Sequence, residues 1–285
     1  MKKGSVHISQ EQIKQFEMEG YLLLNDFYAE DDINEICHAI YLIIGEVIDE
    51  HGLMIGRLPY HPTRFDDGYI EIIRCDRRLG GVIYDAVKQI PAFVRLVADR
   101  RNEQLFKLLR RESLPGLAGN GFGIRINNPE EEKFRASWHQ EYPHQLRSRN
   151  GIVFWAPLLK VEPDMGPVDI LSGSHAEGML PMTKISSGPD AQAGTYAMRL
   201  LNESHYAEKF PMQSPCTAPG DLLVMNFDVI HRSGKNISNR ALWSMQYRLF
   251  DFTESVGRKN GWVGSFGAGV DFSKFHPELL LNQGE

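Results

Sequence analysis

Beginning at Gly119, the sequence breaks into short β-rich runs that are separated by turn residues. The expected strands cover residues 121–127, 135–141, 151–159, 168–171, 195–200, 221–227 and 242–250. Many short strands with turn signals between them are typical of a β-barrel or a β-sandwich. The second half of the chain is therefore predicted to form one of these two architectures.

The part before Gly119 has a helical pattern instead. Ser9 and Gln12 fit a capping box, and Gly20 suits the end of the helix that follows. Residues 21–24 are read as a strand, and apolar residues at helical spacing predict a long helix over 33–48. Further helical patterns cover 79–89 and 91–111.

No linker separates the two halves, so we expect a single domain over residues 1–285, mainly β with flanking helices. In this interpretation, residues 1–118 supply helices that pack outside a jelly roll formed by residues 119–250. Residues 251–285, rich in glycine and aromatic residues, would cover the barrel.

Composition excludes several functional classes. The formal net charge of −6 argues against nucleic-acid binding. The most apolar helical stretch, 39–48, contains Glu46 and is too short to span a bilayer, and no signal peptide is visible. The three widely spaced cysteines form no CxxC motif and suggest a reducing cytosol, so we expect a cytoplasmic protein. The sequence does not indicate an oligomeric state.

The strongest chemical signal is His139-Gln140-Glu141 in the second expected strand. Side chains alternate along a strand, so His139 and Glu141 would point to one face and could share a metal ion. A third ligand must then come from elsewhere, and His231, which follows the strand 221–227, is the best candidate. Two histidines and one carboxylate form the facial triad of non-haem Fe(II) oxygenases.

Chance or an ordinary structural role could also account for these residues. A His-x-Glu pair can arise by chance in a chain with ten histidines, and His231 could be a turn residue without a ligand. His144 does not complete the HExxH pattern of zinc proteases. On a continuous strand, its five-residue offset from His139 would place it on the opposite face, so His144 could support the ligands, contact the substrate or lie at the surface.

The His-x-Glu pair, the GPVDILSGSH stretch from Gly166, the GDLLVMNFDVIH run and Arg240 together resemble the phytanoyl-CoA dioxygenase family. The resemblance is best over residues 119–250. It implies a double-stranded β-helix (a cupin-like jelly roll) and an Fe(II)- and 2-oxoglutarate-dependent dioxygenase. The family usually carries His-x-Asp, whereas this chain has Glu141 at that position.

The resemblance also implies roles for individual residues. His139, Glu141 and His231 would hold Fe(II), and Arg240 would bind the distal carboxylate of 2-oxoglutarate. A guanidinium suits this task because it donates two parallel hydrogen bonds, although Arg240 could instead be a surface residue paired with Asp228 or Asp251.

Further co-substrate contacts are expected from Ser233 and Trp155, by the resemblance. Arg125 and Asn127 alternate on the first β-rich run, so both could face the pocket. The implied reaction is hydroxylation of a small molecule, consuming O₂ and releasing succinate and CO₂. The alternatives are an oxygenase that does not use 2-oxoglutarate and a metal-binding jelly roll without catalysis.

Overall fold

The structure of the protein is a computed structural model that describes residues 6–184, 198–264 and 272–281. The α-helices of these residues are α1 (Gln10–Glu19), α2 (Glu30–Glu50), α3 (Tyr69–Cys75), α4 (Arg77–Val87), α5 (Pro91–Val97), α6 (Arg100–Leu109), α7 (Tyr142–Gln145), α8 (Glu203–Lys209) and α9 (Ser255–Lys259). The strands are β1 (Tyr21–Leu24), β2 (Pro115–Leu117), β3 (Gly123–Asn127), β4 (Gly151–Pro157), β5 (Val168–Leu171), β6 (Met182–Lys184), β7 (Met198–Leu200), β8 (Met212–Gln213), β9 (Leu222–Asn226), β10 (His231–Ser233) and β11 (Leu242–Asp251).

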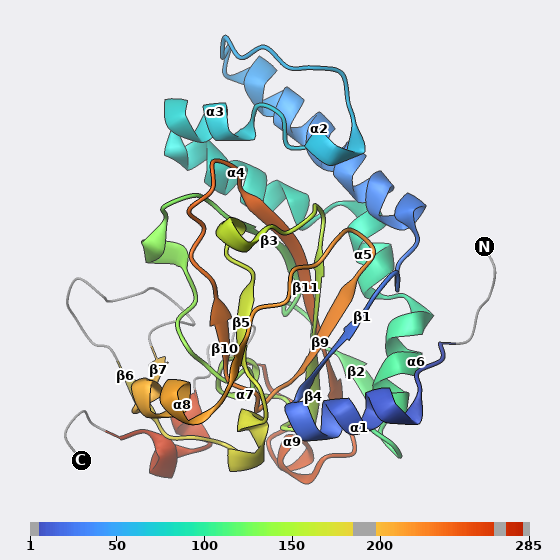
Figure 1. Ribbon diagram of the computed structural model, residues 1–285, viewed down its shortest axis with the longest axis vertical. Coiled ribbons are helices and arrows are strands. Elements are labelled where there is room, and N and C mark those ends of the chain that lie inside the picture. Colours follow the sequence, from blue (N-terminus) through green and yellow to red (C-terminus); the bar gives the residue numbers. More distant parts are fainter. Residues whose placement is uncertain (1–5, 185–197, 265–271, 282–285) are drawn as a thin grey trace.

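Two antiparallel sheets form the centre of the molecule. The larger sheet has the strand order β1-β9-β4-β11-β2, and β3 also pairs with β11. The smaller sheet has the order β10-β5-β8, and β6 and β7 form a separate ribbon. In Figure 1 the helices α2, α3 and α4 gather at one end of the strands, and α5 and α6 run along one side. The prediction of a sheet-rich core with flanking helices is therefore confirmed.

Strand β11 shows how the larger sheet separates a packed face from a polar one. On one face, the ring of Trp243 lies 4.8 Å from that of Tyr69 and 5.9 Å from that of Phe65, which belong to the helical part of the chain. On the other face, Gln246 and Arg248 line a cavity. Alternation along one long strand thus buries aromatic residues against helices and presents polar groups to the interior.

Several local predictions are confirmed. Ser9 and Gln12 form the capping box, Gly20 ends α1 in the left-handed region, and the strand at residues 21–24 is present. The long helix is α2, but the 91–111 pattern divides into α5 and α6, because Asp99 caps a new helix.

The predicted strand over 135–141 is wrong. Only an isolated bridge joins His139 to His231, and Glu141 already has helical angles (φ −73°, ψ −39°). Pro143 suits the first turn of a helix, and α7 follows immediately. Helix α3 and strand β2 were not predicted, and residues 195–197 of another expected strand lie outside the described residues.

Part of the segment expected to cover the barrel contacts α7 and the residues just after it. Tyr142 Oη and His276 Nε2 lie 3.0 Å apart, and the amide of Arg147 donates to the carbonyl of Val263 at 3.0 Å. Within the described ranges, no helix combines the length and apolar character that crossing a membrane requires.

Candidate metal centre

Backbone pairing brings the two histidines of the proposed triad together. The amide of His139 donates to the carbonyl of His231 at 3.0 Å, and the amide of His231 donates back at 3.0 Å. The two ring centroids lie 4.2 Å apart. Residues that are 92 positions apart in sequence are thus fixed as neighbours by the edge of the smaller sheet.

Each histidine ring is oriented by a backbone carbonyl. Nδ1 of His139 lies 2.7 Å from the carbonyl oxygen of Ser137, and Nδ1 of His231 lies 3.1 Å from that of Val229. A carbonyl oxygen only accepts, so Nδ1 is the protonated nitrogen in both rings. The lone pair is then on Nε2, which is the arrangement that metal-binding histidines commonly show.

Glu141 completes the cluster from the start of α7. Its Oε2 atom lies 4.0 Å from Nε2 of His139 and 3.6 Å from Nε2 of His231. One ligand atom from each residue lies within 4.8 Å of the others. Oε2 is buried and has no hydrogen-bond partner among the described residues. A buried carboxylate oxygen without a donor is costly unless a cation binds it.

The electrostatics keep His139 and Glu141 ready to bind a cation. Burial, together with repulsion from the neighbouring His231 and His144, lowers the pKa of His139 well below its ordinary value. Burial alone would raise the pKa of Glu141, but Arg248 and the two histidines hold that pKa well below its usual range. The centre therefore offers a neutral imidazole and an ionised carboxylate, and this donor set fits ferrous iron.

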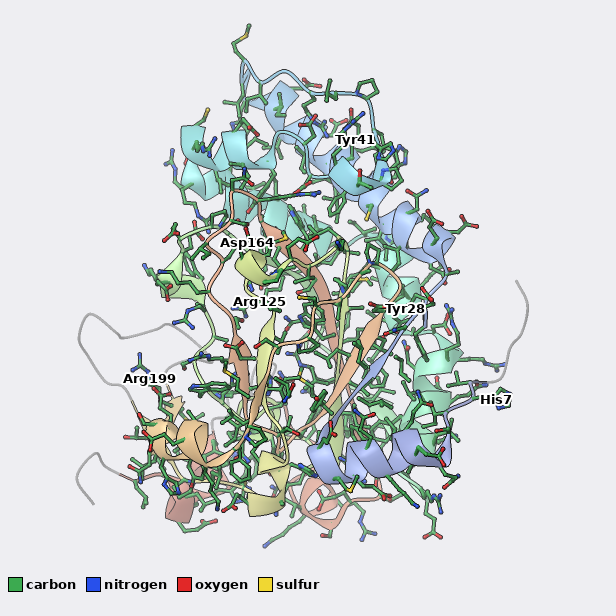
Figure 2. The ribbon with its side chains drawn as sticks, in the orientation of Figure 1. His7, Tyr28, Tyr41, Arg125, Asp164 and Arg199 are labelled. Atoms are coloured by element: carbon green, nitrogen blue, oxygen red, sulfur yellow. The ribbon has the colours of Figure 1, made fainter. Side chains whose placement is uncertain are left out.

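A cavity of about 640 Å³ opens beside the triad. Its lining includes Trp155 of β4, Ser233 of β10 and Arg125 of β3. Figure 2 labels Arg125 among the strands in the middle of the molecule. Asn127 accepts a hydrogen bond from Nε of Arg125 at 2.8 Å and so orients the guanidinium. The structure thus brings four of the predicted co-substrate contacts to or next to the cavity.

Arg240, the fifth predicted contact, is not among the residues that line the cavity, so the sequence-based assignment of this residue is corrected. Its Nη2 and Nε atoms donate to the carboxylate of Asp66 at 2.6 and 3.0 Å, and Nη2 also donates to the carbonyl of Thr63 at 2.8 Å. The buried carboxylate of Asp66 holds this guanidinium at the helical part of the molecule.

Two cavity residues have other positions or roles than the sequence suggested. His144 was expected on the opposite face from His139, but α7 turns it into the cavity, with its ring centroid 5.5 Å from that of His139. Arg248 was not identified, although its Nε donates to Oε1 of Glu141 at 2.9 Å. The sequence offered one signal for Arg248: on the expected strand over 242–250, alternation places it on the same face as the polar residues Ser244 and Gln246.

Comparison with known proteins agrees with this geometry. The family model described as "Phytanoyl-CoA dioxygenase (PhyH)" matches residues 16–241. No curated protein sequence matches the chain.

Among solved structures, the chain is similar to EctD from S. alaskensis with 2-oxoglutarate and 5-hydroxyectoine (15% identity, 87% of this chain and 77% of that one, TM-score 0.57). It is also similar to the non-heme alpha ketoglutarate dependent carbocyclase SnoK from nogalamycin biosynthesis (12% identity, 86% and 85% covered, TM-score 0.55). A third is the epimerase SnoN in complex with Fe³⁺, alpha ketoglutarate and nogalamycin RO (14% identity, 92% and 91% covered, TM-score 0.54). At these identities the likeness establishes the shared fold.

Proposed function

The chain belongs to the phytanoyl-CoA dioxygenase family, whose members are Fe(II)- and 2-oxoglutarate-dependent dioxygenases, and we propose that it hydroxylates a small-molecule substrate in the cavity beside His139, Glu141 and His231. O₂ and 2-oxoglutarate would be consumed together, and succinate and CO₂ would be released.

One observation carries this proposal. Oε2 of Glu141 is buried, has no hydrogen-bond donor among the described residues, and faces the Nε2 atoms of both histidines. Two backbone carbonyls already fix the tautomers that direct those lone pairs to the same place. A divalent cation at this point would satisfy all three groups at once, and a facial triad leaves further coordination positions open.

The iron, the triad and the cavity walls would each have a separate role. Bound ferrous iron supplies the redox chemistry that couples 2-oxoglutarate decarboxylation to substrate oxidation. The triad holds the ion, and the cavity walls hold the organic molecules and exclude water. A volume of about 640 Å³ is in the range of cavities that enclose small ligands.

For the co-substrate, we assign the distal carboxylate to Arg125. This residue lines the cavity and lies opposite Ser244 of β11, on the face that also carries Gln246 and Arg248. Its Nε is oriented by Asn127, and its Nη2 donates to the carbonyl of Phe134 at 2.6 Å. A guanidinium suits a carboxylate because it can donate two parallel hydrogen bonds. Ser233 and Trp155 would contact the same molecule.

The cysteines support a reducing location. Cys37, Cys75 and Cys216 are all free thiols in the described part of the chain. Such thiols persist where the surroundings are reducing, so we propose the cytoplasm as the working compartment.

The proposal is tested by metal binding and by succinate formation. Purified protein should bind one Fe(II) and convert 2-oxoglutarate to succinate under O₂, slowly alone and faster with a substrate. The His139→Ala and His231→Ala variants should lose both properties, whereas His144→Gln should still bind the metal. Stoichiometric metal without succinate under any substrate screen would favour a non-catalytic binding protein, and full turnover by either alanine variant would refute the triad.

A further inference from the structure

Arg248 is a charged residue outside the triad that contacts one of its members. Its side chain is only 14% exposed, and its Nε donates to Oε1 of Glu141 at 2.9 Å. Nη1 donates to the carbonyl of Gly121 at 3.1 Å, and Nη2 donates to Oε1 of Gln246 at 3.3 Å. The guanidinium is therefore held at three points, and its position is set by β11 and by the loop before β3.

This contact gives the two carboxylate oxygens of Glu141 different surroundings. Oε1 accepts from Arg248, whereas Oε2 has no donor among the described residues and faces the histidines. A carboxylate can bind a cation through one oxygen or through both. Glutamate also has one more rotatable bond than the aspartate that usually occupies this position in the family, so its carboxylate has more freedom to be restrained.

We propose that Arg248 is a positioning residue that restrains Glu141 so that Oε2 alone faces the metal position. The inference rests on the proposed function of this cluster as an iron centre. It explains how the longer glutamate can serve in a triad where aspartate is usual. The hydrogen bond from Arg248 to Oε1 restricts the longer side chain to positions in which Oε2 faces the metal. It also leaves the remaining coordination positions available for the co-substrate and O₂.

A purely electrostatic role and a positioning role for Arg248 predict opposite changes in metal affinity when the residue is removed. Arg248 places a positive charge next to a cation site, so its removal should tighten metal binding if charge were its only contribution. Removal of a positioning residue should weaken metal binding, because the carboxylate is no longer fixed. The sign of the change therefore separates the two roles.

The test is a double-mutant cycle on metal affinity, with Co(II) or Mn(II) titrated into metal-free protein. Arg248→Met should weaken binding about tenfold or more when Glu141 is present, as is typical of residues that orient metal ligands. In the Glu141→Asp background the same change should lower metal affinity less than about threefold, because the shorter side chain lacks the additional rotatable bond that Arg248 restrains. The Co(II) absorption spectrum should change with Arg248→Met only when Glu141 is present.

Two further variants keep the test decisive. Arg77→Met removes another cavity arginine, whose Nη2 donates at 2.7 Å to Glu131, a residue outside the triad, and should leave metal affinity unchanged. Arg248→Lys preserves the buried charge in case the methionine variant does not fold, and should show an intermediate loss with a shifted Co(II) spectrum.

The outcomes distinguish this inference from the proposed function. If the wild-type protein binds no metal, the proposed iron centre itself fails. If the wild type binds metal, the positioning role is overturned by unchanged or tighter binding in both Arg248 variants. It is equally overturned if Arg248→Met has the same effect in the wild-type and Glu141→Asp backgrounds, because both carry one carboxylate charge.

Discussion

The sequence assigns the co-substrate carboxylate to Arg240 and suggests only that Arg125 could face the pocket, but the structure surrounds the two arginines differently. Arg125 lines the cavity, and its neighbour Asn127 fixes its orientation. Arg240 is held by the carboxylate of Asp66, whose side chain is only 6% exposed. Each residue therefore has a distinct expected phenotype.

We expect Arg125→Ala to raise the KM for 2-oxoglutarate by on the order of ten- to a hundredfold, the effect of losing one charge-assisted hydrogen bond. Arg240→Ala should leave that KM unchanged. It should instead lower the free energy of unfolding by about 1–3 kcal/mol, because Asp66 loses its donors in a buried position. Steady-state kinetics and urea unfolding of the two variants check both statements. A raised KM in Arg240→Ala would return the anchor role to that residue.

The same two residues show how far the sequence could define the site. The His-x-Glu spacing and the later His231, together with the resemblance to the dioxygenase family, were enough to identify the triad, although the strand expected over residues 135–141 is absent. Nothing local to Arg240 reveals that its partner is Asp66, 174 positions away. Arg248 was missed because its role appears only when β11 is placed beside Glu141.

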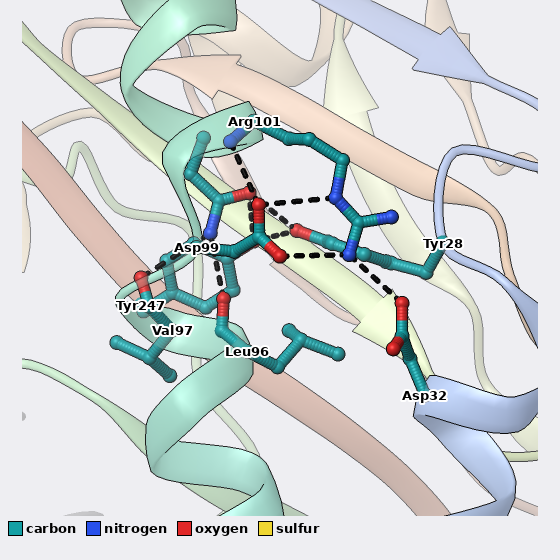
Figure 3. A network of polar contacts seen from close by, with 8 residues as sticks. Tyr28, Asp32, Leu96, Val97, Asp99, Arg101 and Tyr247 are labelled. Atoms are coloured by element: carbon teal, nitrogen blue, oxygen red, sulfur yellow. Dashed lines mark hydrogen bonds and ion pairs between the residues drawn. The ribbon is translucent and has the colours of Figure 1, made fainter. Parts of the chain in front are cut away.

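At the scale of elements, a buried polar network joins the helices to the larger sheet (Figure 3). Oδ1 of Asn102 in α6 accepts from the hydroxyl groups of Tyr28 and Tyr247 at 2.7 and 3.2 Å. Its Nδ2 donates to the carbonyls of Leu96 and Val97 at 2.8 and 3.2 Å. One amide thus satisfies the carbonyls at the end of α5 and two buried hydroxyl groups, one of them on β11.

Asn102→Leu has a similar volume but cannot make these bonds. We expect it to cost at least about 2 kcal/mol in the free energy of unfolding, because buried acceptors lose their donor. The matched control is Arg95→Ala, which removes an exposed ion pair between α5 and Glu35 of α2 and should cost less than about 1 kcal/mol. Denaturant unfolding of both variants measures the difference. Equal losses would mean that the network contributes no more than a surface contact.

The elements that the sequence predicted well share a physical property. Strands 21–24 and 168–171 and the long helix α2 carry strong local patterns of apolar residues. Strand β10 and the bridge at His139 are too short to have a periodicity of their own, and they exist because tertiary pairing holds them. The metal ligands lie in these short segments, so their geometry could not be derived from local pattern.

At the scale of the whole molecule, the triad links segments that are far apart in the sequence. His139 and Glu141 precede β4, whereas His231 begins β10, after β9 of the larger sheet. The amide of Glu141 also donates to the carbonyl of Phe227 at 2.8 Å, so the ligand segments are already bound to each other. A cation held by all three side chains would bind the folded chain and not the unfolded one. Metal binding should therefore stabilise the entire molecule.

The size of this effect follows from mass action. At a Mn(II) or Co(II) concentration of about 100 times Kd, the free energy of unfolding should rise by about 2.7 kcal/mol. At roughly 2–4 °C per kcal/mol, Tm should rise by about 5–10 °C, which differential scanning fluorimetry can measure. Asn102→Leu changes a residue that contacts none of the three ligands, so it should start from a lower Tm and show the same increase. His231→Ala should show none. An equal increase in His231→Ala would place the stabilising ion elsewhere, and its absence in the wild type would mean that the three side chains do not act as one metal site.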